Sequence, residues 1–146
     1  MKIECIQERL MEAVSTVEKI TGKNASLPIL SSIVIEADKN NLTLKSTNLD
    51  LGIEILVPAK IDEPGAVAVS GTILSTFLSG VVGEKIKMEL KDSNLKISTS
   101  KNNTTIKVLP IDDFPMIPRV EGDSFELDGK QFVKGRTIEE ALDRSK

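Results

Sequence analysis

Between residues 33 and 56 the chain alternates apolar and polar side chains in three short runs. A period of two places the apolar residues of each run on one face of a β-strand. Residues 38–41 and 46–48 separate the runs, and these side chains favour turns because they tolerate left-handed backbone and bond to their own main chain. The pattern predicts three antiparallel strands joined by tight turns. The alternating apolar positions are Ile33, Ile35, Leu42, Leu44, Leu49, Leu51, Ile53 and Ile55.

The same pattern returns over residues 86–109, which align with residues 33–56 without a gap. Core positions fall on core positions, as with Ile33 and Ile86 or Leu44 and Ile97, and turns fall on turns. Antiparallel meanders also resemble one another by chance, which is the alternative reading. Because a strand and a helix-like stretch precede each meander, the sequence predicts one β-α-β-β-β unit used twice, over about residues 1–58 and 65–109.

Each unit contains one stretch of helical periodicity. In the first, apolar residues recur from Ile6 to Ile20 and Gly22 is a natural stop, while the charges of the opposite face nearly cancel. That face is either a solvated surface or a surface directed at DNA. In the second, Ser70 can cap a nearly uncharged helix that runs to about Val81. We expect an α+β fold in which both helices pack on one face of an antiparallel sheet, with the other face outward.

The remaining segments connect and end these units. Pro28 is expected to lead into an extended strand, and Pro58, Pro64 and Gly65 mark the link between the halves. Three prolines in residues 110–118 predict a stiff, extended exit. The first domain is therefore expected over residues 1–121. Residues 122–146 are predicted to be a linker and the truncated start of a second domain, with a strand at 124–127, a turn at 128–129 and a short, weakly indicated helix at 138–142.

The composition excludes several kinds of site. The 146 residues include no His, so imidazole acid–base catalysis and His metal ligation are absent. The net charge is −3, unlike that of a protein that grips nucleic acid by phosphate contacts alone. The single cysteine, Cys5, cannot form an internal disulfide, which fits a reducing cytoplasm, and its apolar neighbours predict a small buried side chain. We expect no signal peptide and no membrane span.

Two features remain as candidate sites. Asp112 and Asp113 form an acidic pair that could hold Mg²⁺, but no phosphate-binding glycine loop accompanies them, and a turn role explains them equally. A small metal-dependent enzyme is therefore the weakest of three readings. The last strand of the second meander, residues 104–108, is expected at a sheet edge. An unpaired edge can dock a partner strand, so a protein-interaction module is a second reading.

The third and leading reading comes from a resemblance that spans residues 1 to about 120. The chain resembles the bacterial β sliding clamp, the processivity factor of the replicative DNA polymerase, through motifs that occur in order. The resemblance implies the DNA clamp fold, a first clamp domain, and no catalytic activity, metal or cofactor. Residues 125–127 resemble the opening strand of the second clamp domain. The matching residues are 27–30, 42–44, 47–51, 63–65, 109–110 and 113–115.

The resemblance also implies a mechanism and partners. Clamp subunits close head to tail into a ring whose helices line a hole, so duplex DNA is held by enclosure while the polymerase stays tethered. The implied partners are double-stranded DNA, the polymerase, the clamp loader and further clamp subunits, although the family's peptide pocket lies in domains beyond this chain. The implied DNA contacts are Lys23, Asn24 and Thr72, where the family is more basic. The implied subunit interface comprises Leu74, Phe77, Leu78, Thr104, Ile106 and Val108.

Overall fold

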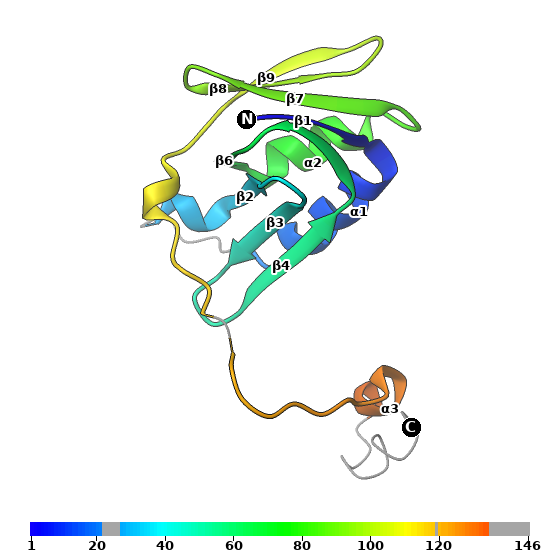
Figure 1. The fold of residues 1–146 in the computed structure, drawn as a ribbon, viewed down its shortest axis with the longest axis vertical. Coiled ribbons are helices and arrows are strands. Elements are labelled where there is room, and N and C mark those ends of the chain that lie inside the picture. The colour runs from blue at the N-terminus through cyan, green and yellow to red at the C-terminus, as the bar shows by residue number, and fades with distance from the viewer. Residues whose placement is uncertain (22–26, 119, 135–146) are drawn as a thin grey trace.

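The computed structural model of the chain describes residues 1–21, 27–118 and 120–134 (Figure 1). A strand, a helix and a three-strand meander occur twice in succession, so the element order reproduces the predicted duplication. One strand that was not predicted, β5, lies between the two units. The first unit comprises β1 (Lys2–Ile6), α1 (Gln7–Glu18), the 3-10 turn η1 (Pro28–Ser31), β2 (Ser32–Ala37), β3 (Leu42–Thr47) and β4 (Gly52–Val57). After β5 (Ala59–Glu63) the second comprises β6 (Gly65–Ser70), α2 (Gly71–Ser79), β7 (Lys85–Lys91), β8 (Asn94–Ser98) and β9 (Asn103–Lys107).

The strands form two antiparallel sheets, ordered β5-β1-β7-β8-β9 and β4-β3-β2-β6. The first strand of each unit pairs with the meander of the other unit: Cys5 of β1 lies opposite Ile86 of β7, and Val69 of β6 lies opposite Ile33 of β2. The two helices and the antiparallel strands are as predicted. The single sheet that we expected is divided in two, because this exchange gives each meander one strand from the other half.

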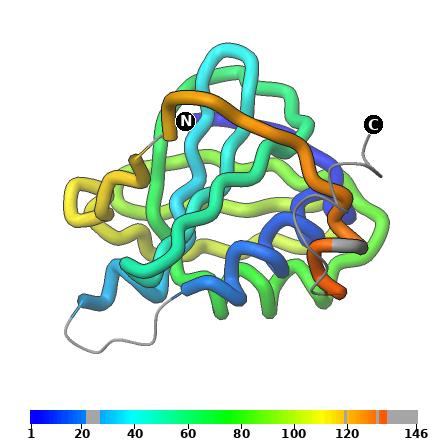
Figure 2. The backbone as a smooth tube through the Cα atoms, turned by 90° about the horizontal axis from the view of Figure 1, so that it is seen from below, coloured from blue at the N-terminus to red at the C-terminus, as the bar shows by residue number. Residues whose placement is uncertain are grey.

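The two helices lie side by side and share one core with both sheets. α1 contacts α2 and also packs against β1, β2, β3 and β4, and Figure 2 shows both helices on the same side of the molecule. Alternate residues of the strands point into this core, where Ile33 and Ile86 are both fully buried, as are Leu44 and Ile97. The aligned positions in the first two strands of each meander therefore occupy equivalent buried sites, as predicted. The prediction was wrong at Leu49 and Leu51, which are 58% and 53% exposed, because they lie in the turn before β4 (Gly52–Val57) and not in the strand.

The turns of the meanders use the side-chain chemistry that the sequence indicated. Asp38 Oδ1 accepts hydrogen bonds from the backbone N–H groups of Asn40 and Asn41 at 2.9 and 2.8 Å, and these bonds lower the pKa of Asp38. Asn48 and Thr99 begin the β3–β4 and β8–β9 turns in the same way. A side-chain oxygen at the first position satisfies the N–H groups that the tight turn leaves unpaired.

Three local predictions differ from the structure. Residues 28–31 form the turn η1 before β2 begins, whereas we expected an extended strand. The link between the halves contains β5, which pairs with β1 along one sheet edge. At the start of α1 the buried residue is Gln7, while Ile6 is 55% exposed, because the helix begins one residue later than the apolar spacing indicated. The predicted helix stop at Gly22 lies outside the described residues.

The exit segment, residues 109–118, crosses the outer face of the four-stranded sheet. Leu109 donates its N–H to the carbonyl of Ala68 at 2.8 Å, and the turn η2 (Ile111–Asp113) follows. The sheet face that we expected to be outward is therefore partly covered. Leu109, Ile111 and Phe114 pack against a second cluster of buried residues, made of Ile29, Leu30, Val34 and Ala68.

Beyond the exit segment the chain runs away from the two sheets and ends its described part in α3 (Gly129–Val133) (Figure 1). The predicted strand over residues 124–127 is not formed, and Phe125 is exposed there. A strand needs a neighbour to bond its backbone groups, and the described residues after 118 contain no other strand. In place of the predicted turn at 128–129, Asp128 precedes α3 and Gly129 is its first residue. The helix expected at 138–142 lies outside the described residues.

Candidate functional site

The helix layer, made of α1 and α2, is the first candidate surface for DNA. Its two helices are joined by Gln7, whose Nε2 donates to the carbonyl of Leu78 at 2.8 Å and whose Oε1 accepts from the N–H of Gly83 at 3.4 Å. Gln7 is 4% exposed. A buried amide in this position satisfies polar groups at the end of α2 from the start of α1, and so fixes how the two helices lie against each other.

The charge of the helix layer does not favour phosphate binding. α1 carries Glu8, Glu12 and Glu18 against one base, Arg9, and Lys19 follows directly at its C-terminal end. α2 carries no charged residue. Phosphate contacts depend on Lys and Arg, so the described part of this layer offers hydroxyl groups and few positive charges to a duplex.

Only one of the three predicted DNA contacts lies in the described residues. Thr72 occupies the first turn of α2 with its side chain exposed, next to the capping bond that Ser70 Oγ accepts from the Ile73 N–H at 3.4 Å. Lys23 and Asn24 fall in residues 22–26, outside the described part of the chain. The three-residue contact therefore stays a prediction.

The second candidate surface is the edge of the five-stranded sheet at β9. The structure places β9 at the end of the strand order, next to β8 alone. Thr99 and Val108 donate backbone hydrogen bonds across the β8–β9 pair, to Asn102 and Ser93 respectively. Bonded pairs alternate along antiparallel strands, so the N–H groups at even positions of β9 point to β8. Those at odd positions, including that of Thr105, point to the free edge.

The six residues predicted for the subunit interface divide by burial. Leu74 and Leu78 are fully buried and Ile106 is 4% exposed, so these three belong to the core of this chain and support the edge from within. Thr104, Phe77 and Val108 are half-buried. An interface along β9 would therefore use main-chain groups and these three side chains, and the assignment stays a prediction.

The acidic pair has the setting of a turn. Asp112 and Asp113 lie in η2 with exposed side chains, and the cap bond there runs from the Phe114 N–H to the Ile111 carbonyl at 3.0 Å. Within residues 1–21, 27–118 and 120–134, no group of three or more His, Cys, Asp or Glu side chains could hold a metal ion. Nor does this part of the chain contain a helix long and apolar enough to cross a membrane.

Comparison with known proteins decides the family. The family model for the DNA polymerase III beta subunit, N-terminal domain, matches residues 1–118. The chain belongs to this family. Its likeness to solved beta-subunit structures agrees in fold: a putative DNA polymerase III beta subunit from Eubacterium rectale aligns with a TM-score of 0.81 and 30% identity, over 85% of this chain and 34% of that one.

Other relatives of the beta subunit family give the same picture. The beta sliding clamp of Buchnera aphidicola is 32% identical over 119 residues, which are 79% of this chain and 32% of that protein. The beta sliding clamp of Synechocystis sp. is 30% identical over 84% of this chain and 34% of its own length. A Caulobacter crescentus sliding clamp structure has a TM-score of 0.77 at 26% identity, over 82% of this chain and 33% of that one. This chain thus spans about a third of these beta-subunit relatives.

Two features of the structure were missed from the sequence. Gln7 fell between apolar positions, and no periodicity marks a polar residue that a fold buries. The strand β5 did carry a signal, since Ala59 and Ile61 alternate with Lys60 and Asp62, and both apolar side chains pack against the core. The two flanking prolines, Pro58 and Pro64, marked this segment as the link between the halves, and the strand within that link was missed.

Proposed function

We propose that this chain forms the first third of a DNA sliding clamp, a ring that encloses duplex DNA and tethers the replicative polymerase. The observation that supports this most directly is the side-by-side packing of α1 and α2 on one side of a duplicated unit, in a chain whose residues 1–118 match the beta-subunit family. Such a chain is a non-catalytic subunit that needs no cofactor. Its partners are double-stranded DNA, the polymerase, the clamp loader and further clamp domains, and it acts in the cytoplasm.

Retention by enclosure fits the charge of the helix layer. A surface with three glutamates against Arg9 and Lys19 holds phosphates weakly, and weak contacts permit sliding, whereas strong phosphate contacts are salt-sensitive and resist movement. In this proposal Thr72 and the segment containing Lys23 and Asn24 touch the backbone of the enclosed duplex, and the ring supplies the retention.

Ring closure is assigned to the β9 edge. The odd-numbered N–H groups of β9 would bond a strand of the neighbouring subunit and so continue the five-stranded sheet across the joint. Phe77, Thr104 and Val108 would cover this joint, and Leu74, Leu78 and Ile106 would hold the edge in position from the core.

A chimeric clamp tests the proposal. Residues 1–118 of this chain would replace the matching segment of the Synechocystis sp. clamp, and the product would be loaded on nicked circular duplex. Because a ring slides off a free end, the protein should survive a high-salt wash on the circle and be lost once a restriction enzyme linearises it. Enclosure would be contradicted if the protein were retained equally on circular and linear DNA. It would also be contradicted if the high-salt wash removed the protein from the circular DNA as well as from the linear DNA.

Two proline variants of the chimera separate ring closure from folding. Thr105→Pro removes an N–H that points to the free edge, so the ring should open while the helical and strand content stays unchanged. Thr104→Pro removes an N–H that bonds β8, so this variant should also lose thermal stability. If Thr105→Pro leaves retention on circles unchanged, the joint does not use the β9 edge.

One alternative function has support from the topology. β9 is an edge strand of the five-stranded sheet, so the chain could act as an interaction module that pairs this edge with a partner strand without enclosing DNA. Under this alternative, Thr105→Pro would abolish binding of a partner protein by the 146-residue chain, and the chimera would show no dependence on DNA circularity.

A further inference from the structure

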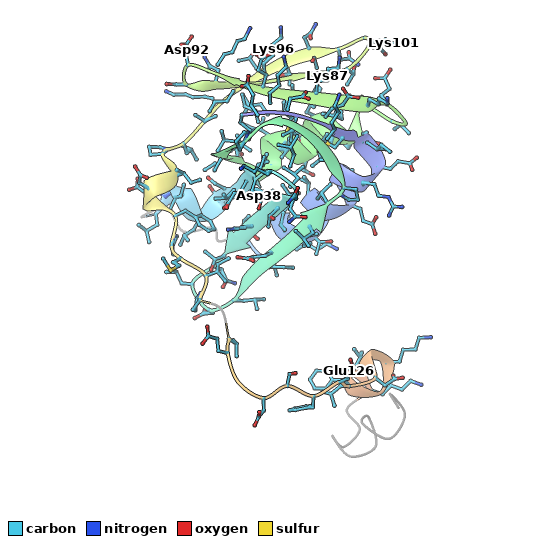
Figure 3. The ribbon with its side chains drawn as sticks, viewed as in Figure 1. Asp38, Lys87, Asp92, Lys96, Lys101 and Glu126 are labelled. Carbon is cyan, nitrogen blue, oxygen red and sulfur yellow. The ribbon has the colours of Figure 1, made fainter. Side chains whose placement is uncertain are left out.

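The outward face of the β7–β8–β9 meander concentrates positive charge in an acidic chain. We name this surface, formed by Lys85, Lys87, Lys91, Lys96 and Lys107, the lysine face; all five are exposed and two are labelled in Figure 3. Their neighbours along the strands point the other way, into the core. Five lysines stand against one acidic residue at the outward positions of these strands, Glu89, which leaves an excess of four positive charges. Since the whole chain carries −3, everything outside this face sums to −7.

Three of these lysines form a row without ion pairs. Lys85 and Lys91 approach Glu4 and Glu89 at 3.6 and 3.9 Å. Among the described residues, no acidic side chain forms a salt bridge with Lys87, Lys96 or Lys107, which are exposed.

The strand register sets the geometry of this row. Lys87 lies opposite Ser98, which is two residues from Lys96, and Lys96 lies opposite Thr105, which is two residues from Lys107. Each step is thus a diagonal of about 7–8 Å, so the row spans about 15 Å. One strand of a duplex carries a phosphate for about every 3.4 Å of helix axis, so three lysines face about four phosphates.

The residues around the row decide which polyanion fits. Ser98, Thr105 and Asn94 lie beside the lysines and add hydroxyl and amide donors, which are frequent phosphate contacts. Two carboxylates also border the row, since Glu89 lies opposite Lys96 and Glu4 lies opposite Lys87. The outward positions of β7, β8 and β9 carry no aromatic residue on which bases of a single strand could stack. They also carry no large apolar residue of the kind that anchors a protein partner.

Glu84 borders the lysine face at one end, but its carboxylate accepts a hydrogen bond from the Ser100 hydroxyl at 2.6 Å and lies beyond the diagonal row. The outer face of the other sheet differs, since it carries Glu36 and Glu54 around Lys45 and is partly covered by the exit segment. The lysine face is therefore an uncovered cationic surface that offers hydrogen-bond donors and has no aromatic or large apolar side chain on which bases or a protein partner could pack.

We propose that the lysine face binds the phosphate backbone of duplex nucleic acid, independently of sequence and separately from the helix layer. Its side of the five-stranded sheet is turned away from the core that the helices share. Binding there needs only the folded unit, so it holds whether or not a ring closes. In a clamp it would give the outer surface a weak, salt-sensitive contact with duplex that is not enclosed.

The test uses the 146-residue chain and a short, blunt, fluorescent duplex of mixed sequence, with binding measured by anisotropy over a series of salt concentrations. Three phosphate contacts predict a slope of log affinity against log salt of about −2.7, which is about a 40-fold loss between about 50 and 200 mM. The double variant Lys87→Gln with Lys96→Gln leaves one phosphate contact, so its slope should be only about −0.9. Its affinity should then decrease only about threefold to fourfold over the same range of salt concentration.

A matched control carries the same charge change elsewhere. Lys39→Gln with Lys134→Gln alters two exposed lysines outside the five-stranded sheet and should keep the original slope. If both double variants weaken binding equally, or neither does, the lysine face is not the site. Circular dichroism of each variant shows whether the fold is intact.

Two competitor arms identify the ligand. A single-stranded oligonucleotide of equal charge should displace the duplex poorly, and tighter binding of the single strand would overturn the assignment to duplex. Poly-glutamate of equal charge should also compete poorly, and efficient displacement would identify an acidic polypeptide as the occupant instead. None of these arms depends on circular DNA, so their failure is distinguishable from failure of the ring proposal.

Discussion

Replacing Gln7 by glutamate should destabilise the chain at neutral pH by about 3 kcal/mol or more, although the side chain keeps its shape. In the native chain the amide nitrogen donates to the Leu78 carbonyl at 2.8 Å, and the residue is 4% exposed. A carboxylate would place an acceptor against that carbonyl and a charge in the core. Gln7→Leu removes the same hydrogen bond without adding a charge.

The two substitutions separate the two costs. For Gln7→Leu we expect a loss of about 1–2 kcal/mol, because Leu78 keeps the bond from the Val81 N–H at 3.2 Å and the Gly83 N–H loses only a long bond of 3.4 Å. The additional loss in Gln7→Glu is the cost of burying the charge.

The pH dependence of Gln7→Glu has a definite sign. Burial raises the pKa of the new carboxyl in the folded state above its value in the unfolded chain. Between those two values the folded state binds more protons, so the free energy of unfolding falls as pH rises and recovers on acidification. The protonated carboxyl can again donate to the Leu78 carbonyl. Gln7→Leu should show no such dependence relative to the native chain.

Urea unfolding followed by far-UV circular dichroism measures these differences, since the chain contains no Trp or Tyr for fluorescence. The exposed neighbour gives the control: Glu8→Gln should stay within about 0.5 kcal/mol. Equal midpoints for Gln7→Glu and Gln7→Leu at neutral pH, or a pH-independent difference between them, would refute the buried bridge between the helices.

Three further predictions concern the exit segment and the core. Phe114→Ala should lower the free energy of unfolding by about 2 kcal/mol in the same urea assay, because Phe114 is only half-buried. Gly52→Ala places a Cβ 3.1 Å from Ile117 side-chain atoms, so Ile117 should be displaced and its methyl resonances should shift in NMR spectra. Burial raises the pKa of Cys5 to about 12. Thiol reagents at about pH 8 should therefore modify only the unfolded chain. Between about pH 9 and 12 the thiol ionises in the unfolded chain but not in the folded one, so the free energy of unfolding should decrease progressively with rising pH, by up to about 4 kcal/mol.

The meanders could be predicted from the sequence because period-two alternation reports directly which face of a strand is buried. Leu42 and Leu95 were aligned on pattern alone, and both are fully buried. The turn residues Asp38 and Asn48 were also identifiable, because their bonding partners lie within three residues.

The pairing of strands could not be predicted in the same way. Alternation states that Ile3 and Cys5 are inward, but it does not state whether β1 lies beside its own meander or the other one. That choice depends on how the two helices pack between the sheets, which is a contact between residues far apart in sequence. The burial of Gln7 also depends on contacts between residues far apart in sequence, since its hydrogen-bond partners Leu78 and Gly83 lie 71 and 76 residues away.

Candidate functional residues were predictable only where function depends on local chemistry. The alternation of Lys85, Lys87 and Lys91 is visible in the sequence, yet the diagonal row needs the register of three strands. The predicted interface residues show the converse. Apolar character selected Leu74, Leu78 and Ile106, and apolar character also puts a residue in the core, where the structure has them.

The exchange of first strands makes the duplication a single structural unit. β1 has its sheet partners in β5 and β7, and both lie outside residues 1–58. β6 likewise pairs with β2 of the first half. Neither half can satisfy the backbone of its own first strand alone. The helix layer is therefore fixed from both halves at once, by the exchanged strands and by Gln7 between the helix ends. Any rotation of α1 against α2 would break the buried bond from Gln7 to the Leu78 carbonyl, so the relative orientation of the two helices is set by the fold itself.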